Sequence, residues 1–472
     1  MYQFYPPPPP YQTQQQYLPH YNQPYQPLPQ FPLQPQVVYP PQYRDSNLRN
    51  KDPRSFSELE LSRLLDKQTH VLKELHAKDH QKQLPVIIDA IAILVRVPRT
   101  KLVSTAQNEF FSLLRMPFID ILNQAAQFST LSADEFYIFR AMVKLMRRIV
   151  KAADDLTLIP SWFTDSALLE AISTSLTNLT TTEDILQDNN RALFKPFTRL
   201  IDTYLLYQQL ISQYNHAQTD TLQQLIDSIV HCLTSSHYIR TFASLRVDAR
   251  SMTSIEKFFL VKCPAFLTAY DGSHLEQMMD NLLSTMIPQY AQLLEKLVAS
   301  VRNWKRSTMR AVDHLLQLIS HGAHQYPTNA KYVSDHLSLI DSVLKLVNEP
   351  MFYTNLQGTL SNPETTLINT VVSFLVNMII DPSVLAHIKQ SQMTNAFLRL
   401  TTCAYQPLVF NVYALLAHTT HEEDIKAMPD PGLLFSAIVK SLKTTLKQAS
   451  NSRSHNEQLL ETLKGFSRNI DR

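Results

Sequence analysis

The pattern of apolar and polar positions from residue 55 onward predicts a long succession of amphipathic helices. Ser57 precedes apolar residues that recur at helical spacing, including Leu61, Leu64 and Leu65, so we expect it to cap the first helix. Further segments of this kind cover roughly residues 100–114, 132–152, 165–179, 191–213, 219–236, 251–260, 273–286, 288–301, 305–320, 330–347, 364–380, 383–391, 394–403, 407–419, 431–447 and 454–466. No convincing run alternates with the period of two that a strand requires. The sequence therefore predicts an all-α protein.

Prolines and glycines mark the expected ends of these helices. Pro85 and Pro117 stand where new apolar periods begin, as proline does in the first turn of a helix. The predicted segments on either side of residue 287 meet beside Pro288, and Gly322 falls in a predicted break after residue 320.

Three apolar segments reveal an internal repeat. Residues 311–319 and 371–379 share apolar residues at the first, second, fifth, sixth, eighth and ninth places. Residues 411–417 follow 40 residues after the second segment and keep the second, fifth and sixth. A polar break follows each segment, and the later two then show a short helix and a second long apolar helix.

This order of helices resembles an armadillo/HEAT-type repeat. The resemblance is clearest over residues 360–450 and extends over 300–472. It implies an armadillo-like superhelix of stacked helices with a concave groove. Armadillo units usually carry a glycine between the short and middle helices, whereas this chain has Gln390, Ser391 and Gln392 there. More weakly, residues 405–466 look like the helical region that accompanies a TIR module in some invertebrate proteins.

The composition excludes several classes of function. The 472 residues include only five glycines, none of them in the first 271 positions, so a phosphate-binding loop or a dinucleotide-binding turn cannot form. Lys and Arg number 43 against 41 Asp and Glu, and this net charge of +2 argues against nucleic acid or an anionic membrane as a general partner. Three widely spaced cysteines favour a reducing location, which we expect to be the cytoplasm, with the nucleus as an alternative.

The N-terminal tail differs from the rest of the chain. Residues 1–43 lack Asp, Glu, Lys and Arg and hold 13 of the 28 prolines, which predicts a disordered Pro/Gln/Tyr-rich segment. Two matches to the Pro-Pro-x-Tyr ligand of WW domains supply the candidate partner-binding residues, and SH3-type domains are alternative readers. Those residues are Pro8, Pro9 and Tyr11 in the first match, and Pro40, Pro41 and Tyr43 in the second. Composition alone predicts about one such match.

We divide the chain into a tail and linker at residues 1–54, a helical region at 55–300, and armadillo-like repeats at 301–472. No stretch has the length of ~20 apolar residues that a membrane span needs, so no membrane insertion is expected.

Candidate metal or catalytic groups are weakly supported. Histidine sets at 76 and 80, at 314, 321 and 324, and at 418 and 421 lack a complete ligand pattern. Cys232 lies on an apolar helix and is interpreted as a core residue. We therefore expect no catalytic residue, no metal and no cofactor.

Three basic stripes have helical spacing: Lys144, Arg147, Arg148 and Lys151; Arg302, Lys305, Arg306 and Arg310; Lys440, Lys443 and Lys447. Hydrated helix faces are the simpler interpretation of all three. Trp304 in the second could offer a stacking surface.

The sequence thus favours a non-enzymatic scaffold or adaptor that binds proteins through a solenoid groove and a proline-rich tail. A sensor or scaffold part of a larger TIR-type signalling protein is one alternative. An enzyme whose site only the fold assembles is another.

Overall fold

The computed structural model describes residues 52–421 apart from 76–79, 128–130, 182–187, 214–221, 271–274, 326 and 355–361, together with positions 423, 426, 432 and 436. These residues all belong to one contact unit, residues 49–472. The described part of the chain contains helices and no strand, which confirms the all-α prediction.

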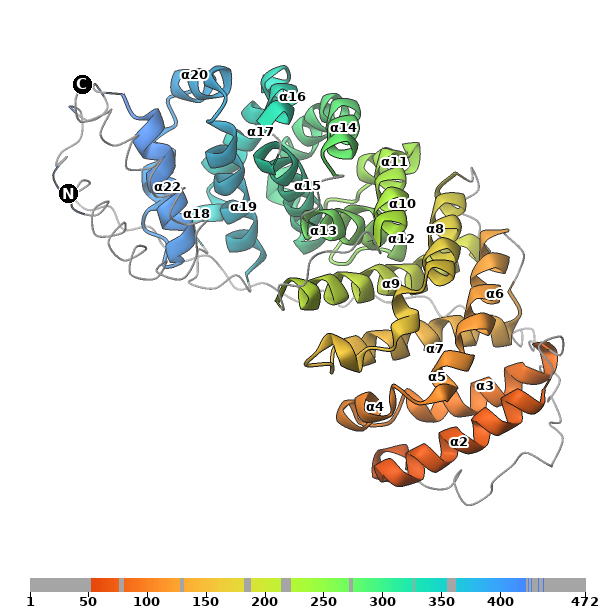
Figure 1. Cartoon of the computed structure of the whole chain (residues 1–472). Coiled ribbons are helices and arrows are strands. Elements are labelled where there is room, and N and C mark those ends of the chain that lie inside the picture. Colours follow the sequence, from red (N-terminus) through yellow and green to blue (C-terminus); the bar gives the residue numbers. More distant parts are fainter. Residues whose placement is uncertain are drawn as a thin grey trace, which may run out of the picture. The chain divides into compact units, whose positions relative to one another are not determined.

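The helices follow one another with short connections (Figure 1). The first half contains α2 (Glu58–Glu74), α3 (His80–Leu94), α4 (Arg99–Thr105), α5 (Glu109–Leu113), α6 (Arg115–Ala126), α7 (Ala133–Val150), α8 (Ser166–Thr181), α9 (Asp188–Gln213), α10 (Gln223–Thr234) and α11 (Ser236–Ala243). The second half contains α12 (Ser254–Lys257), α13 (Cys263–Thr268), α14 (Leu275–Val298), α15 (Arg306–Gln325), α16 (Ala330–Ser334), α17 (Leu337–Asn348), α18 (Met351–Thr354), α19 (Pro363–Met378), α20 (Pro382–Gln390), α21 (Thr394–Leu400) and α22 (Gln406–Thr419). A π-helical turn, η6 (Phe258–Lys262), joins α12 to α13, and the short 3-10 turn η4 (Ser161–Thr164) precedes α8.

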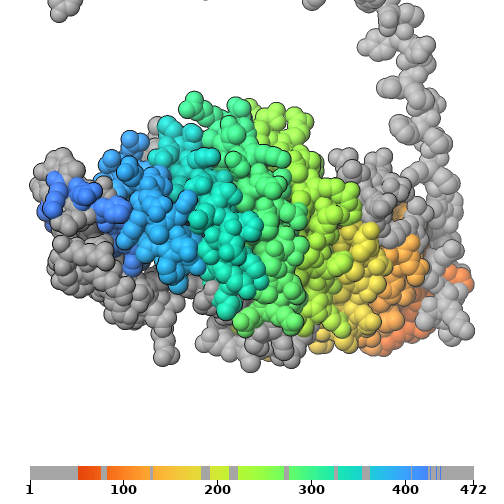
Figure 2. Space-filling view, turned by 90° about the horizontal axis from the view of Figure 1, so that it is seen from above, coloured from red at the N-terminus to blue at the C-terminus, as the bar shows by residue number. Residues whose placement is uncertain are grey.

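The helices stack in two series. The first series runs α3, α7, α9, α13, α15, α19 and α22, each packed on the next. The second runs α6, α8, α10, α14 and α17 in the same manner. Figure 2 shows the same order as successive bands of colour. The two series pack on each other through pairs such as α6 with α7 and α14 with α15, which buries a shared core between them.

Local sequence explains where several helices begin. Ser57 caps α2, since its hydroxyl accepts from the Glu60 amide and the Glu60 carboxylate accepts from the Ser57 amide. The same capping box opens α7 at Ser132 and α12 at Thr253. Each box satisfies two amides that a helix start otherwise leaves without partners, so the predicted cap at Ser57 is confirmed.

The repeat found in the sequence corresponds to real stacking. Residues 311–319 lie in α15, residues 371–377 in α19 and residues 411–417 in α22, which are consecutive members of the first series. Hydrogen bonds between side chains fix the register: Thr370 Oγ1 donates to Asp313 at 2.6 Å, and Asn411 Nδ2 donates to Ser373 at 2.9 Å. The shared apolar positions are therefore the faces through which these helices pack.

Several predicted helix boundaries are wrong. Pro288 lies inside α14, which is one helix where two were predicted, and Pro85 lies inside α3 about one turn after its start. Proline removes one backbone hydrogen bond, but the adjacent Ile287 and Tyr290 are fully buried, and this burial offsets the loss. Conversely, the segment predicted at 330–347 is two helices, α16 and α17.

Gly322 does not end a helix as predicted. It lies within α15, where a Cβ would come 2.5 Å from Cε of Met279 and 2.8 Å from Cδ1 of Leu283 on α14. The glycine therefore permits α14 and α15 to approach closely. Its role is packing between the two series rather than a turn.

Gln392 has a backbone conformation that favours glycine. It lies between α20 and α21 with φ of 53°, the one positive φ of a non-glycine residue in the described chain. A side chain in this left-handed region costs about 1–2 kcal/mol. The turn between α20 and α21 thus contains a left-handed residue, although that residue is not glycine.

We expect Gln392→Gly to raise the free energy of unfolding by about 1 kcal/mol, because glycine relieves the left-handed strain. Urea unfolding of the full chain measures this change. Ser391→Gly is the matched control, since Ser391 has φ of −76° and gains nothing from glycine. A Gln392→Gly protein no more stable than wild type would contradict the assignment of strain.

Candidate functional site

The basic cleft is a hollow of about 630 Å³ on the first series of helices. Its lining combines three apolar or aromatic residues, Val95, Tyr137 and Ala141, with seven cations and no carboxylate. The cations are Arg99, Arg140, Lys144, Arg147, Arg148, Lys151 and Arg199. This concentration contrasts with the net charge of +2 of the whole chain.

Three helices bring these cations together. Four of them lie on α7 and a fifth, Lys151, directly follows its last residue. They are one, three or four residues apart, so they share one face of that helix. Arg99 begins α4 after the end of α3, and Arg199 lies on α9. Since α7 packs between α3 and α9 in the first series, the cations of all three segments converge.

Arg147 is neutralised at the border of the cleft. Its Nη2 lies 2.5 Å from Oδ2 of Asp202 on α9, and Lys262 of η6 binds the other carboxylate oxygen. Burial alone raises the pKa of Asp202, but the hydrogen bonds and charges of Lys262 and Arg147 outweigh it and lower the pKa overall. Asp202 therefore stays ionised and links α7, α9 and η6.

Arg148 forms hydrogen bonds with the backbone. Its guanidinium donates to the carbonyl oxygen of Leu94, the last residue of α3, at 3.0 Å, and to that of Val97, which follows the helix. Burial first, and then the positive charge of Arg99, lower the pKa of Arg148. The positive charge of Arg99 therefore acts on Arg148, and the lining of the cleft contains no carboxylate that would compensate it.

Five cations of the cleft remain without an ion pair to any carboxylate of the described chain: Arg99, Arg140, Lys144, Lys151 and Arg199. Arg140 lies over the Phe136 ring at 5.7 Å and keeps its charge exposed. Crowded cations of one sign repel each other, and an anion placed among them removes this repulsion. The lining of the basic cleft therefore suits an anion.

A second hollow, the Met116 cleft, has a mixed lining and a volume of about 830 Å³. It lies where α2, α5, α6 and η4 meet. Its apolar residues are Leu72, Leu75, Leu113, Met116, Pro117 and Trp162, and its charged residues include Lys73, Arg115, Asp120 and Asp165. Met116 is 52 % exposed, whereas Trp162 is almost fully buried against Phe163 and belongs to the floor.

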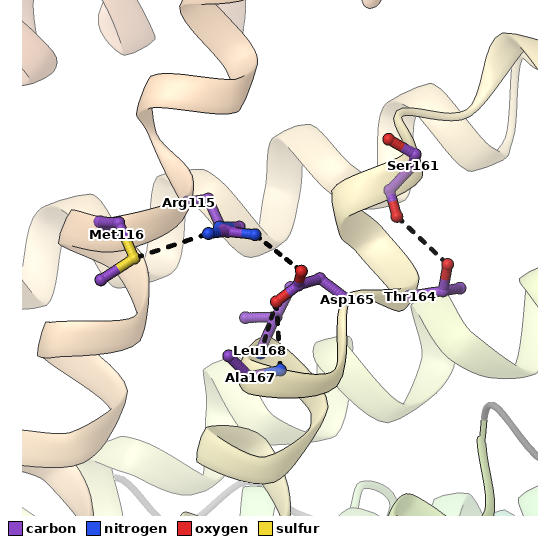
Figure 3. A network of polar contacts seen from close by, with 7 residues as sticks. All are labelled: Arg115, Met116, Ser161, Thr164, Asp165, Ala167 and Leu168. Carbon is purple, nitrogen blue, oxygen red and sulfur yellow. Dashed lines mark hydrogen bonds and ion pairs between the residues drawn. The ribbon is translucent and has the colours of Figure 1, made fainter.

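An ion pair fixes the wall of the Met116 cleft (Figure 3). Arg115 Nη1 donates to Asp165 at 2.7 Å, and Arg115 Nη2 lies 3.9 Å from the Met116 sulfur. Asp165 also accepts from the amides of Ala167 and Leu168 and so caps α8. Because one carboxylate holds both the helix start and Arg115, the guanidinium beside Met116 has a preorganised position.

The predicted tail ligands lie outside the described residues: Pro8, Pro9, Tyr11, Pro40, Pro41 and Tyr43. The third basic stripe, residues 440–447, lies outside them too. The first stripe is more than the hydrated face we expected, because it lines the basic cleft. Only the stacking of helices could reveal this, since Arg99 and Arg199 are distant from the stripe in sequence.

Trp304 is not the stacking surface considered from the sequence. It is 3 % exposed, and its indole N–H donates to the Leu297 carbonyl at 3.0 Å. In the second stripe, Arg306 and Arg310 line a small cavity of about 210 Å³ beside Asp313 and His314.

The cysteines of the described chain are buried and carry no disulfide. Cys232 and Cys263 are fully buried and interact, and burial raises the pKa of the Cys263 thiol, so it stays protonated. The core assignment of Cys232 is thus confirmed. Within the described residues no three His, Cys, Asp or Glu side chains gather in a way that could hold a metal ion.

Comparisons with known proteins place the chain in no family. No protein-family model matches it, and no curated protein is significantly similar. Among solved structures, an engineered protein from a structural genomics consortium is 12 % identical with a TM-score of 0.37, over 87 % of this chain and 99 % of that one. A structure from work on a phosphorylation switch between cadherin and beta-catenin is also 12 % identical, with a TM-score of 0.27, over 88 % and 97 %. Similarity at this level supports no argument about fold detail or function.

A search of the described helices for membrane spans found none that is both long and apolar enough.

Proposed function

We propose that this chain is a non-enzymatic protein-interaction scaffold of armadillo-like type, and that the Met116 cleft receives a segment of a partner protein. The observation that carries the proposal is a preorganised, mixed hollow with a half-exposed methionine at its edge. The two stacked series of helices support it, because such stacks leave long faces free for a partner. A location in the cytoplasm, with the nucleus as alternative, belongs to the same proposal.

The chemistry of the Met116 cleft matches the centre of a protein interface. Methionine, arginine and aromatic residues are enriched at such centres, and the cleft combines Met116, Arg115 and Trp162. The cations Lys73 and Arg115 are paired with Glu109 and Asp165, so the rim carries little unbalanced positive charge. We therefore expect the partner to insert an apolar anchor rather than a charged one.

The tail remains a second contact region of the proposed scaffold. Its two Pro-Pro-x-Tyr matches suit WW domains, with SH3-type domains as alternatives.

We expect Met116→Glu to abolish capture of the partner, because a buried unpaired carboxylate would face the apolar anchor. Full-length wild type and variant are immobilised, and the proteins retained from extracts of the source cells are quantified by mass spectrometry. A partner of this cleft is a protein whose recovery falls about tenfold or more with Met116→Glu.

Ile380→Glu is the matched control, because Ile380 is 65 % exposed in the turn before α20 and lies outside the cleft. It should retain the partner, and both variants should melt like wild type. Equal recovery of every protein by wild type and Met116→Glu would overturn the role of this cleft.

A further inference from the structure

We propose that the basic cleft binds a compact polyphosphate, a free small molecule that carries several phosphate groups on one small scaffold. This site is separate from the Met116 cleft and goes beyond the proposed scaffold function. Its evidence is charge, size and the identity of the cations.

The charge of the cleft requires a multivalent anion. Five cations face it without an ion pair to a carboxylate, and the two others, Arg147 and Arg148, are already held by Asp202 and by carbonyl oxygens. A single carboxylate or chloride would leave most of this charge uncompensated. A phosphate monoester carries about −1.5 to −2 charges and three acceptor oxygens, so two or three of them balance the five cations.

The size of the cleft requires that this charge be compact. A volume of about 630 Å³ falls within the ~300–1,000 Å³ of small-molecule sites. The cations converge from three helices on one hollow, and Arg147 at its edge is already compensated by Asp202. A ligand that fits must present several charges within that hollow.

The identity of the lining favours phosphate over a nucleobase. Five of the seven cations are arginines, whose planar guanidinium groups bind phosphate oxygens in pairs. Tyr137 is the one aromatic residue in the lining, whereas single-stranded nucleic acid needs a series of stacking rings. The lining of the cleft is therefore suited to bind phosphate groups rather than nucleobases.

Arg148 and Arg147 would act as fixed walls for this ligand. Their guanidinium groups are oriented before a ligand arrives, by carbonyls of α3 and its following turn and by Asp202 of α9. The exposed side chains Arg140 and Lys144 on α7 have no such tether and are free to close on the phosphates. They are the residues to test, because their removal leaves the packing of the helices intact.

The experiment is calorimetric titration of the full chain with inositol hexakisphosphate as the probe, at about physiological ionic strength. We expect saturable binding with one site. The double variant Arg140→Gln plus Lys144→Gln should weaken it at least about tenfold, since each lost charge-assisted hydrogen bond corresponds to roughly that factor.

Lys296→Gln plus Lys345→Gln is the matched control. Both lysines are exposed and lie on α14 and α17 of the second series. Their replacement removes the same total charge as the test variant. This control should bind the probe within about twofold of wild type, because neither lysine lines the basic cleft. The melting temperatures of both variants verify that each is folded.

Each alternative outcome has a definite meaning. No binding by wild type, or equal weakening by both double variants, overturns the site. Binding to vesicles containing phosphatidylinositol 4,5-bisphosphate without binding of the soluble probe would overturn the free ligand in favour of a lipid headgroup. Tighter binding of a single-stranded RNA than of the probe, with the same dependence on Arg140 and Lys144, would overturn it in favour of nucleic acid. Met116→Glu should leave probe binding unchanged, so failure here and failure of the scaffold function are distinguishable.

Discussion

Phe194→Ala is expected to lower the free energy of unfolding by about 3–5 kcal/mol, the largest loss we expect from any single substitution considered. Phe194 is 0 % exposed on α9, in the middle of the first series. Its ring centroid lies 5.3 Å from that of Phe258 and 5.9 Å from that of Phe259, both in the π-helical turn η6. Truncation removes the apolar surface and leaves a cavity between α9 and η6 that the surrounding helices can close only in part.

The measurement is urea unfolding of the full chain followed by circular dichroism. Phe194→Leu is the matched control, because it keeps most of the volume and should cost under about 1.5 kcal/mol. If Phe194→Ala costs no more than Phe194→Leu, the cluster formed with Phe258 and Phe259 does not hold α9 against η6.

The pattern of apolar residues predicted the helices and one part of their stacking. The alignment of residues 311–319, 371–379 and 411–417 found three helices that pack consecutively, because each must bury the same face against its neighbours. The pattern gave a wrong result at Pro288. Proline locally favours a helix start there, but one continuous helix buries Ile287 and Tyr290 and is the structure formed. It failed at Gly322, since the proximity of Met279 and Leu283 is a tertiary fact.

The two clefts were beyond the sequence for a related reason. The stripe on α7 was visible, but Arg99 and Arg199 join it only because α7 packs beside α3 and α9. Asp202 pairs with Arg147 from 55 residues away in the sequence. The sequence therefore does not show which cations of the stripe form an ion pair and which do not. At the Met116 cleft, Arg115 and Asp165 are 50 residues apart in the sequence, and no local motif predicts that they form an ion pair.

The second large effect is a dependence of stability on pH that resides in His314. This histidine lies on α15 beside Lys262 and Arg310, and burial, followed by the charge of Lys262, lowers its pKa to about 4. In the unfolded chain an imidazole has a pKa of about 6.5. Between these two values the unfolded state binds the proton and the folded state does not. Stability is therefore full above about pH 6.5 and falls as the pH drops toward 4.

The expected loss is about 2–3 kcal/mol between pH 7 and pH 4.5, measured as the free energy of unfolding in urea. Asp313 next to His314 acts in the opposite direction, because burial raises its pKa against the hydrogen bonds of Thr370 and Gln317. Its contribution cancels when wild type and His314→Gln are compared at each pH. The variant should therefore gain about 2 kcal/mol relative to wild type on going from pH 7 to pH 4.5.

His231→Gln is the matched control, since His231 is exposed on α10 and its ring meets water in both states. The substitution removes no buried side chain, so this control should change the free energy of unfolding by less than about 0.5 kcal/mol. A difference between wild type and His314→Gln that stays constant from pH 7 to pH 4.5 would show that the imidazole of His314 takes up its proton as easily in the folded chain as in the unfolded one. Lys262 and Arg310 would then not oppose its charge.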